Sequence, residues 1–272
     1  MRIRRDVRLF LGSLLLIVCV LTSFVAPALT PYTPDAQDLS QRLTPPGSSA
    51  HPFGTDPLGR DLLTRISFGV RVSLIVGIVS VVVAGGIGVP LGLIAGFYGG
   101  YVDGVVMRLV DLQLAVPFLV LALAIVAVSG PSLINLVAVL ALSGWVVYAR
   151  VVRGQVLVLR AQEFVTAARA LGAKPARILL RHVLPQVMPS VIVVSTQQVG
   201  IMILTESSLS FLGLGMPVSI PSLGSIAADG RDYLTTAWWV TTLAGAAIVI
   251  IVLGINLFGD WLRDHLDPTV RS

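Results

Sequence analysis

The residue types that usually carry catalysis are sparse in this sequence and are not spaced for it. A phosphate-binding loop needs Gly-x-x-x-x-Gly-Lys-Ser/Thr, because backbone amides and the lysine hold the phosphates, but the only lysine, Lys174, stands between Ala173 and Pro175. The three histidines lie in separate segments, at none of the spacings typical of metal sites. No serine has a general base beside it, and the single cysteine, Cys19, has no partner for a disulfide. The sequence therefore predicts no catalytic residue, no metal site and no ATPase site in this chain.

Polar residues do gather in one strongly apolar segment, residues 188–209. They are Ser195, Thr196, Gln197, Gln198, Thr205, Glu206, Ser207 and Ser208. Each should face protein or water, because polar groups are costly in hydrocarbon. Gln198, Met202 and Thr205 share one helical face. Together with Glu206 they are candidates for the wall of a translocation path, but hydrogen bonds between helices would explain the same residues. For Glu206, near the end of the segment, a helix-end hydrogen bond is an equal alternative to a substrate contact.

The composition is that of a membrane protein. Of 272 residues, 55% are hydrophobic and only 12% charged, with a mean hydropathy of +0.90. A soluble domain carries about 25% charged residues, because its surface must be wetted. The net charge of +5 comes without any nucleic-acid-binding motif, so no nucleic-acid partner is expected.

Six apolar segments are long enough to cross a bilayer, which needs about 20 residues of helix. They are residues 9–29, 73–97, 109–128, 133–151, 188–209 and 237–257. The first is longer than the core of a cleaved signal peptide, which favours a retained span. The fold class predicted from these segments is an all-α membrane protein with about six transmembrane helices.

The basic residues predict the orientation, because cytoplasmic segments carry an excess of Lys and Arg. With the N-terminus inside, the outer segments hold only Arg42, Arg60, Arg65, Arg71 and Arg231 of the 19 basic residues. Both termini are therefore expected in the cytoplasm.

The chain divides into residues 1–70 and 71–272. The first part comprises a transmembrane helix, a proline-rich outer loop expected to dock a partner, and a helix over residues 60–71. In that helix Leu62, Leu63, Ile66 and Val70 form one apolar stripe, which predicts a helix lying in the membrane interface. The second part holds five spans, a glycine-rich second span that indicates close packing, and an expected ion pair between Arg108 and Asp111.

The longest inner segment, about residues 152–187, is patterned for helices rather than for a plain connector. Small side chains at Ala167 and Ala168 would let a short helix sit close in a groove of another protein. Gly172 would end that helix by accepting a left-handed turn, and Pro185 would end the next. We expect this segment to be a docking element under the membrane.

The spacing in this segment resembles the EAA loop of ABC importer permeases. The family pattern is Glu-Ala-Ala, three residues, Gly, nine residues, a hydrophobic residue or His, one residue, then Leu-Pro. Thr166 replaces the Glu, which removes any charge contact expected there. The resemblance implies that the ATPase is contacted by Thr166, Ala167, Ala168, Gly172, His182, Leu184 and Pro185.

Three other segments are similar to one branch of that family, the dipeptide/oligopeptide/nickel permeases of the DppC/OppC-like type. They are His-Pro-Phe-Gly-Thr-Asp-Pro-Leu-Gly-Arg-Asp at 51–61, Glu-Ser-Ser-Leu-Ser-Phe-Leu-Gly-Leu-Gly at 206–215, and residues 256–268 with Asp267-Pro268. The four motifs follow the family's order over nearly the whole chain. The resemblance implies a MetI-like type I importer fold in a bacterial plasma membrane. It also implies a second homologous permease, two ATP-binding subunits that hold ATP and Mg, and an extracytoplasmic substrate-binding protein.

Two other classes remain as alternatives. A secondary transporter or channel would show inverted repeats or facing broken helices, and no repeat is visible. A membrane enzyme would need paired catalytic groups, which are absent from the sequence. Among substrates, short peptides are favoured over glutathione-like molecules and nickel chelates.

Overall fold

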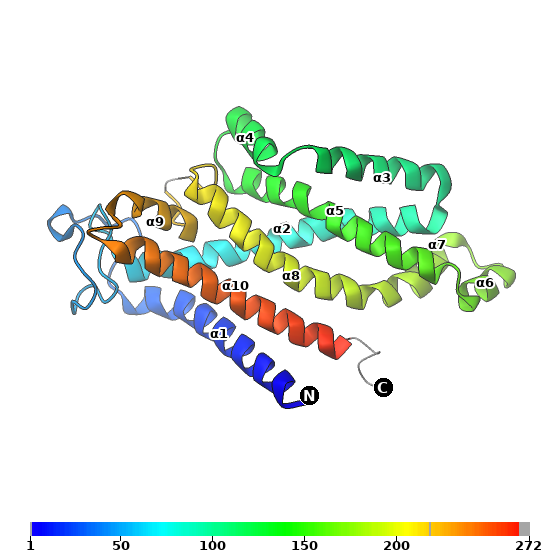
Figure 1. Cartoon of the computed structure of the whole chain (residues 1–272), viewed down its shortest axis with the longest axis horizontal. Coiled ribbons are helices and arrows are strands. Elements are labelled where there is room, and N and C mark those ends of the chain that lie inside the picture. The colour runs from blue at the N-terminus through cyan, green and yellow to red at the C-terminus, as the bar shows by residue number, and fades with distance from the viewer. Residues whose placement is uncertain (1, 218, 267–272) are drawn as a thin grey trace.

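The computed structural model describes residues 2–217 and 219–266. Within these ranges every regular element is helical, apart from one isolated β-bridge between Thr55 and Asp61, so the predicted all-α class is confirmed. The helices form an elongated bundle (Figure 1). The loop of residues 30–61 and the short helix α9 (Leu223–Asp229) lie at one end, called here the loop end. Helix α6 (Glu163–Ala170) lies at the other, called the α6 end.

Four helical stretches are long and apolar enough to cross a membrane: α2 (Leu62–Tyr98), α5 (Leu133–Leu159), the continuous run Pro175–Phe211, and α10 (Trp238–Leu266). Helices α3 (Gly100–Ala115) and α4 (Phe118–Ser129) count as a fifth span if taken as one bent pair. Helix α1 (Arg2–Leu29) carries a shorter apolar stretch, Leu9–Val25. Each of the six predicted apolar segments thus corresponds to a helical stretch, but by length and composition only four or five of these stretches among the described residues could cross a membrane.

The expectation of a separate interfacial helix over residues 60–71 is wrong, because α2 begins at Leu62 and residues 62–71 are its first turns. Asp61 caps the helix by accepting a hydrogen bond from the amide of Thr64 at 2.8 Å, and no helix-breaking residue separates Arg71 from the apolar run. The stripe of Leu62, Ile66 and Val70 is buried against α9 and α10. The amphipathic pattern therefore marks a protein-facing surface.

The third span, expected as one helix over residues 109–128, is broken by a bend of 83° between α3 and α4. Pro117 lacks an N–H to donate and disfavours a helical conformation at Val116, which is extended at φ −89° and ψ 119°. The expected pair of Arg108 and Asp111 does not form; Asp111 instead accepts a hydrogen bond from Arg150 of α5, at 3.2 Å.

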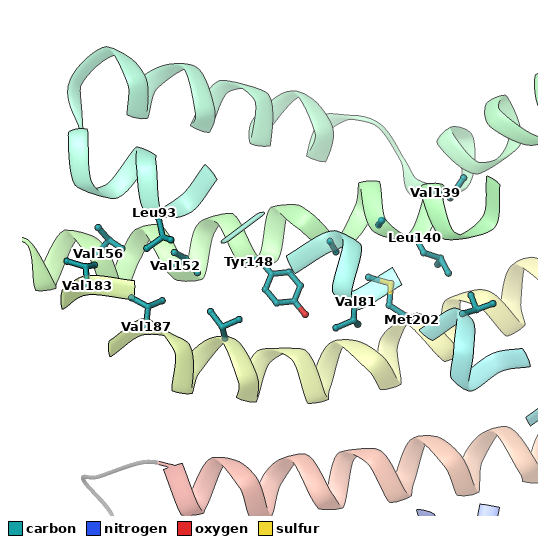
Figure 2. Close-up of a cluster of buried hydrophobic side chains, with 14 of the residues drawn as sticks. Val81, Leu93, Val139, Leu140, Tyr148, Val152, Val156, Val183, Val187 and Met202 are labelled. Carbon is teal, nitrogen blue, oxygen red and sulfur yellow. The ribbon is translucent and has the colours of Figure 1, made fainter. Parts of the chain in front are cut away.

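The core lies where α2, α5 and the run leading into α8 (Leu184–Phe211) meet (Figure 2). Gly88, Gly92 and Gly96 face α5, four residues apart on α2. A Cβ at Gly92 would lie 2.6 Å from the carbonyl oxygen of Ala149, and one at Gly96 would lie 2.8 Å from Val156. The predicted close packing of the second span is therefore confirmed at these positions, whereas Gly86, on the same helix, has open space.

Candidate coupling and translocation surfaces

The segment at the α6 end has one face built into the bundle core. Val165 of α6 and Ile178 of α7 (Pro175–Ile178) are 0% and 1% exposed, and both belong to the cluster that continues between α2, α5 and α8. Displacement of this segment would therefore displace the packed side chains of the bundle, because interiors at this density transmit strain.

The residues of the EAA-like spacing divide between the two faces of this segment. Thr166 and Ala167 are exposed, whereas Ala168 is half-buried and packs against the core. Gly172 has φ +76°, the left-handed turn predicted from the sequence, and nothing lies within 4 Å of a Cβ placed on it. Its backbone, rather than the space around it, requires glycine.

Pro185 does not end a helix, contrary to the prediction. A π turn over Leu179–Val183 precedes it, in which the amide of Leu184 reaches the carbonyl of Leu179, and the helix continues through α8. Pro185 then occupies the first turn of α8, where its missing N–H costs little. His182 and Leu184 lie half-buried in this junction, and His182 Nδ1 is buried without a hydrogen-bond partner among the described residues.

Two exposed leucines on this segment were not predicted. Leu171 is 88% exposed at the end of α6, and Leu180 is 61% exposed on the π turn. The small residues Ala167 and Ala170 on the same segment are also exposed. No periodicity could have identified Leu171, because it lies at a helix end where sequence pattern does not fix direction.

Two arginines, Arg153 on α5 and Arg160 at its C-terminal cap, stabilise the chain reversal between α2 and α3. Arg153 makes a two-pronged ion pair with Asp103 of α3, with Nη2 2.7 Å from the carboxylate. Arg160 donates a hydrogen bond to the carbonyl of Gly96 at 3.0 Å. These contacts join elements 50 and 64 residues apart in sequence, so local spacing could not reveal them.

On α8, most of the predicted path residues lie inside the chain. Gln198, Met202 and Glu206 are 5%, 2% and 0% exposed, and only Thr205 is partly exposed. The hydroxyl of Thr205 donates to the carbonyl of Ile201 at 2.7 Å, a bond within its own helix. The structure thus brings the first three together in the packed interior, and their role in a path stays a prediction.

Glu206 is surrounded by serine hydroxyls. Ser73 of α2 donates to its Oε2 at 2.8 Å, and Ser210 donates to its Oε1 at 2.7 Å. Ser207 donates a longer hydrogen bond to Oε2 at 3.3 Å, and Ser222 lies close enough to interact with the same carboxyl. These serines satisfy a buried carboxyl that would otherwise be strongly destabilising. One alternative expected for Glu206 was a hydrogen bond at the end of its own helix. Its carboxyl instead lies where α8, α2 and the start of α9 meet.

The loop end is built around a second buried polar cluster. Asp56, 0% exposed, accepts hydrogen bonds from Nε of Arg60 at 2.6 Å and from Arg65. His51 Nδ1 lies 3.0 Å from Asp61, and Trp239 of α10 donates to the carbonyl of Thr55 at 3.2 Å. Residues 51–61, found from the sequence as a motif, therefore form a fixed part of the bundle.

The surface of residues 30–61 carries an exposed acid. The hydroxyl and amide of Ser40 both donate to Asp38, and these hydrogen bonds hold the pKa of Asp38 below its usual value. The group therefore stays charged at neutral pH.

Among the described residues there is no group of three or more His, Cys, Asp or Glu that could hold a metal ion. The arrangement offers docking and mechanical coupling surfaces at the two ends of a bundle.

Comparison with known proteins covers almost the whole chain. A family model described as the binding-protein-dependent transport system inner membrane component matches residues 88–272. A model described as the N-terminal TM domain of oligopeptide transport permease C matches residues 1–46. The matched range includes Asp267 and Pro268, which lie outside the described residues.

Named relatives are about 40% identical. The dipeptide transport system permease protein DppC of Alkalihalophilus pseudofirmus is 40% identical over 100% of this chain and 89% of its own length. The di/tripeptide transport system permease protein DppC of Pseudomonas aeruginosa is 42% identical over 96% and 88%. The glutathione transport system permease protein GsiD of Pectobacterium atrosepticum is 40% identical over 96% and 87%.

Among solved structures, a chain of the MetNI methionine ABC transporter in an inward-facing conformation matches with a TM-score of 0.61. It is 22% identical, and the match covers 76% of this chain and 96% of that one. This similarity supports a common fold.

Proposed function

We propose that this chain, which belongs to the family of binding-protein-dependent transport system inner membrane components, forms half of the translocation path of an ATP-driven importer of short peptides. The observation that carries the proposal is the segment at the α6 end. One of its faces is locked into the core by Val165 and Ile178, and its other face presents small residues at the family's spacing. A segment of this kind can both bind a motor subunit and move the bundle.

The exposed face formed by Thr166, Ala167, Ala170 and Leu171 is the docking site for an ATP-binding subunit. Small side chains allow close approach, and Leu171 supplies an apolar anchor of the type that fills pockets at interfaces. Two such subunits, one for each permease chain, bind ATP and Mg. Ala168 and His182 act on the inner side, where they fix the segment to the bundle.

The α6 end faces the cytoplasm. Seven of the 19 basic residues lie between Arg150 and Arg181 in this part of the chain, as the positive-inside rule requires. The first turn of α1 and the last turn of α10 point toward the same end (Figure 1). Both termini are therefore cytoplasmic, and residues 30–61 form the face that meets the substrate-binding protein.

The names of the relatives favour peptides as the substrate. They include dipeptide, di/tripeptide and glutathione permeases, so a peptide bond is common to their cargoes. Nickel chelates or another small solute are the alternative within the same family. A secondary transporter that works without ATP is the alternative outside it.

The proposal is tested by uptake in proteoliposomes that contain this chain, the second permease and two ATPase subunits, with the binding protein added outside. We expect labelled dialanine to enter only when ATP is inside, and an ATPase variant that cannot hydrolyse ATP to abolish entry. Uptake of ⁶³Ni²⁺ chelates without peptide uptake would show that the substrate is a nickel chelate rather than a peptide. Uptake that proceeds equally without ATP would overturn the importer assignment.

A second prediction concerns the face of α8 that borders the path. Thr205 and Ser208 are at least partly exposed, whereas Gln198 is 5% exposed. Cysteine variants Thr205→Cys and Ser208→Cys, made in a Cys19→Ser background, should react with a small charged thiol reagent at rates that change with bound nucleotide. Gln198→Cys should react at least about tenfold more slowly, since opening the packed core costs more than about 1.4 kcal/mol.

Equal labelling of Thr205→Cys in the nucleotide-free and nucleotide-bound states would argue against a path along this face. Val82→Cys serves as the control, because its side chain is 66% exposed on α2 within the apolar run. A charged reagent should not reach it from water.

A further inference from the structure

Helix α9 is wedged between three long helices at the loop end. A Cβ at Gly224 would overlap the carbonyl oxygen of Ser207 on α8, and a Cβ at Gly69 of α2 would lie 3.1 Å from the amide nitrogen of Leu223. From α10, the hydroxyl of Thr241 donates to the carbonyl of Ala227 at 3.0 Å. Backbones this close leave α9 little freedom to move separately from α8.

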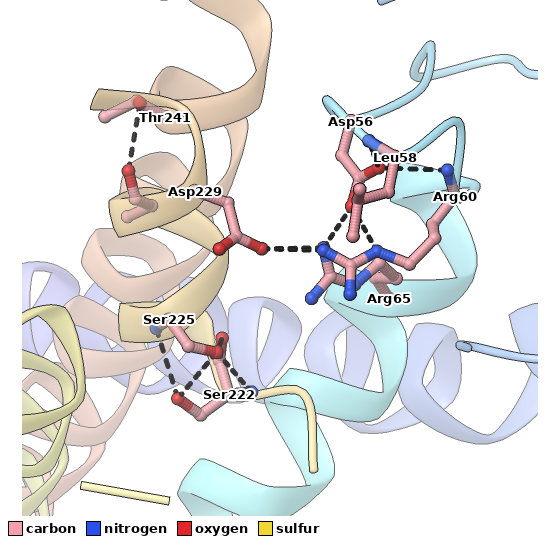
Figure 3. Close-up of polar contacts among 9 residues, drawn as sticks. Asp56, Leu58, Arg60, Arg65, Ser222, Ser225, Asp229 and Thr241 are labelled. Atoms are coloured by element: carbon pink, nitrogen blue, oxygen red, sulfur yellow. Dashed lines mark hydrogen bonds and ion pairs between the residues drawn. The ribbon is translucent and has the colours of Figure 1, made fainter. Parts of the chain in front are cut away.

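The C-terminal end of α9 is joined to the outer loop by charge. Asp229 lies 2.9 Å from Nη2 of Arg60 and 3.0 Å from Nη1 of Arg65 (Figure 3). Both arginines are almost fully buried, and both also bind Asp56 of the outer loop. The two arginines and two aspartates balance in charge, so the cluster is neutral only while Asp229 stays in place.

The N-terminal end of α9 is joined to α8. Ser222 caps the helix by accepting a hydrogen bond from the amide of Ser225 at 3.2 Å. Ser222 also lies close enough to interact with the carboxyl of Glu206 on α8, which is bound in turn by Ser73 of α2. The seven residues of α9 thus connect two buried acid-centred clusters, Asp56 with its arginines and Glu206 with its serines.

We propose that α9 is the element that relays engagement of the binding protein from the outer loop to α8, with Asp229 and Glu206 as the positioning residues at its two ends. The inference rests on the proposed function, because it assumes that residues 30–61 meet the binding protein. A push on the loop moves Asp56 and the two arginines, and Asp229 passes the displacement to α9. Helix α8 continues from Glu206 back to the segment that docks the ATPase, so the signal reaches the motor through one helical run.

The test uses the complete reconstituted importer and measures ATP hydrolysis with and without peptide-loaded binding protein. In Asp229→Asn the basal rate should stay within about twofold of the unaltered complex. The stimulation by the binding protein should fall about tenfold or more, the size of a typical coupling between sites. Glu206→Gln breaks the other end of the relay and should show the same loss. The matched control is Asp232→Asn, three residues on, because its carboxylate is 79% exposed and pairs only with Arg231 among the described residues.

Hydrogen exchange of the backbone amides of residues 223–229 distinguishes a relay from a purely structural role of α9, because only a relay predicts that exchange changes when the binding protein docks. In the unaltered complex, docking of the binding protein should change the exchange of α9. In Asp229→Asn, docking should proceed with the same affinity and leave α9 unchanged. Full stimulation in both variants would overturn the relay, and so would a loss that is explained entirely by weaker docking. A failure of the proposed function is distinguishable, because the unaltered complex itself would then show no ATP-dependent uptake.

Discussion

Replacing Ala167 with tryptophan should release the ATPase subunits and abolish transport while the membrane bundle stays folded. Ala167 is exposed on α6, on the face opposite the buried Val165. A bulky side chain there meets no part of this chain, but it would prevent the close approach of a partner groove. Overpacking one well-fitted contact costs about 1–3 kcal/mol, and losing the approach altogether removes the whole docking surface. The measurement is co-purification of the ATPase subunits with Ala167→Trp, alongside peptide uptake.

The neighbouring position provides an internal contrast. Ala168 packs against the core, so Ala168→Trp should lower the thermal stability of the chain itself, and its effect on docking would be indirect. Ala50→Trp, at an exposed site on the loop end, should retain the ATPase subunits. Normal co-purification and normal uptake in Ala167→Trp would show that this face is not the docking site.

The second large effect is expected from valine at Gly92. A Cβ there would lie 2.6 Å from the Ala149 carbonyl oxygen and 2.9 Å from Val152 Cβ, so α2 and α5 would have to separate. These helices form the largest pairing in the bundle. We expect Gly92→Val to lose at least about 3 kcal/mol of stability, above the usual range for overpacking because backbone rather than a flexible side chain is in the way.

The control for this prediction lies six residues earlier on the same helix. Gly86 is exposed and a Cβ there would meet nothing within 4 Å. Gly86→Val therefore introduces the same residue into the same helix without the clash. Thermal unfolding in detergent and the yield of monodisperse protein should separate the two variants. Equal yields and equal melting temperatures would mean that α2 and α5 tolerate a wider spacing.

Much of the fold could be predicted from the sequence, because each bilayer span requires a long apolar run. The failures have physical causes. The stripe of Leu62, Ile66 and Val70 predicts an amphipathic helix correctly, but a stripe does not say whether it faces lipid or protein, and here it faces α9 and α10. The effect of Pro117 was missed because the apolar run continues on both sides of it. The opposite mistake occurred at Pro185, where the π turn allows the helix to continue.

Features of the candidate sites that depend on neighbouring residues could be predicted from the sequence, whereas contacts between distant residues could not. The left-handed turn at Gly172 was predictable, since one residue's backbone requirement is local. The ion pair between Asp229 and Arg65 joins residues 164 positions apart, and no pattern within either segment indicates it. For Glu206 the residue was identified, but Ser73, which binds its carboxyl from α2, lies 133 positions away in the sequence. A single sequence could not show whether it faces a path or a junction.

The length of the continuous helical run Pro175–Phe211 determines how far a small tilt at one end moves the other end. Its 37 residues, at 1.5 Å per residue, extend about 55 Å along the axis, against a hydrocarbon thickness of about 30 Å. Over that length a tilt of about 5° displaces the far end by about 5 Å, close to one helical turn. A rotation of this run by a few degrees at the α6 end would therefore move its other end, at the loop end, by about the size of an amino-acid side chain.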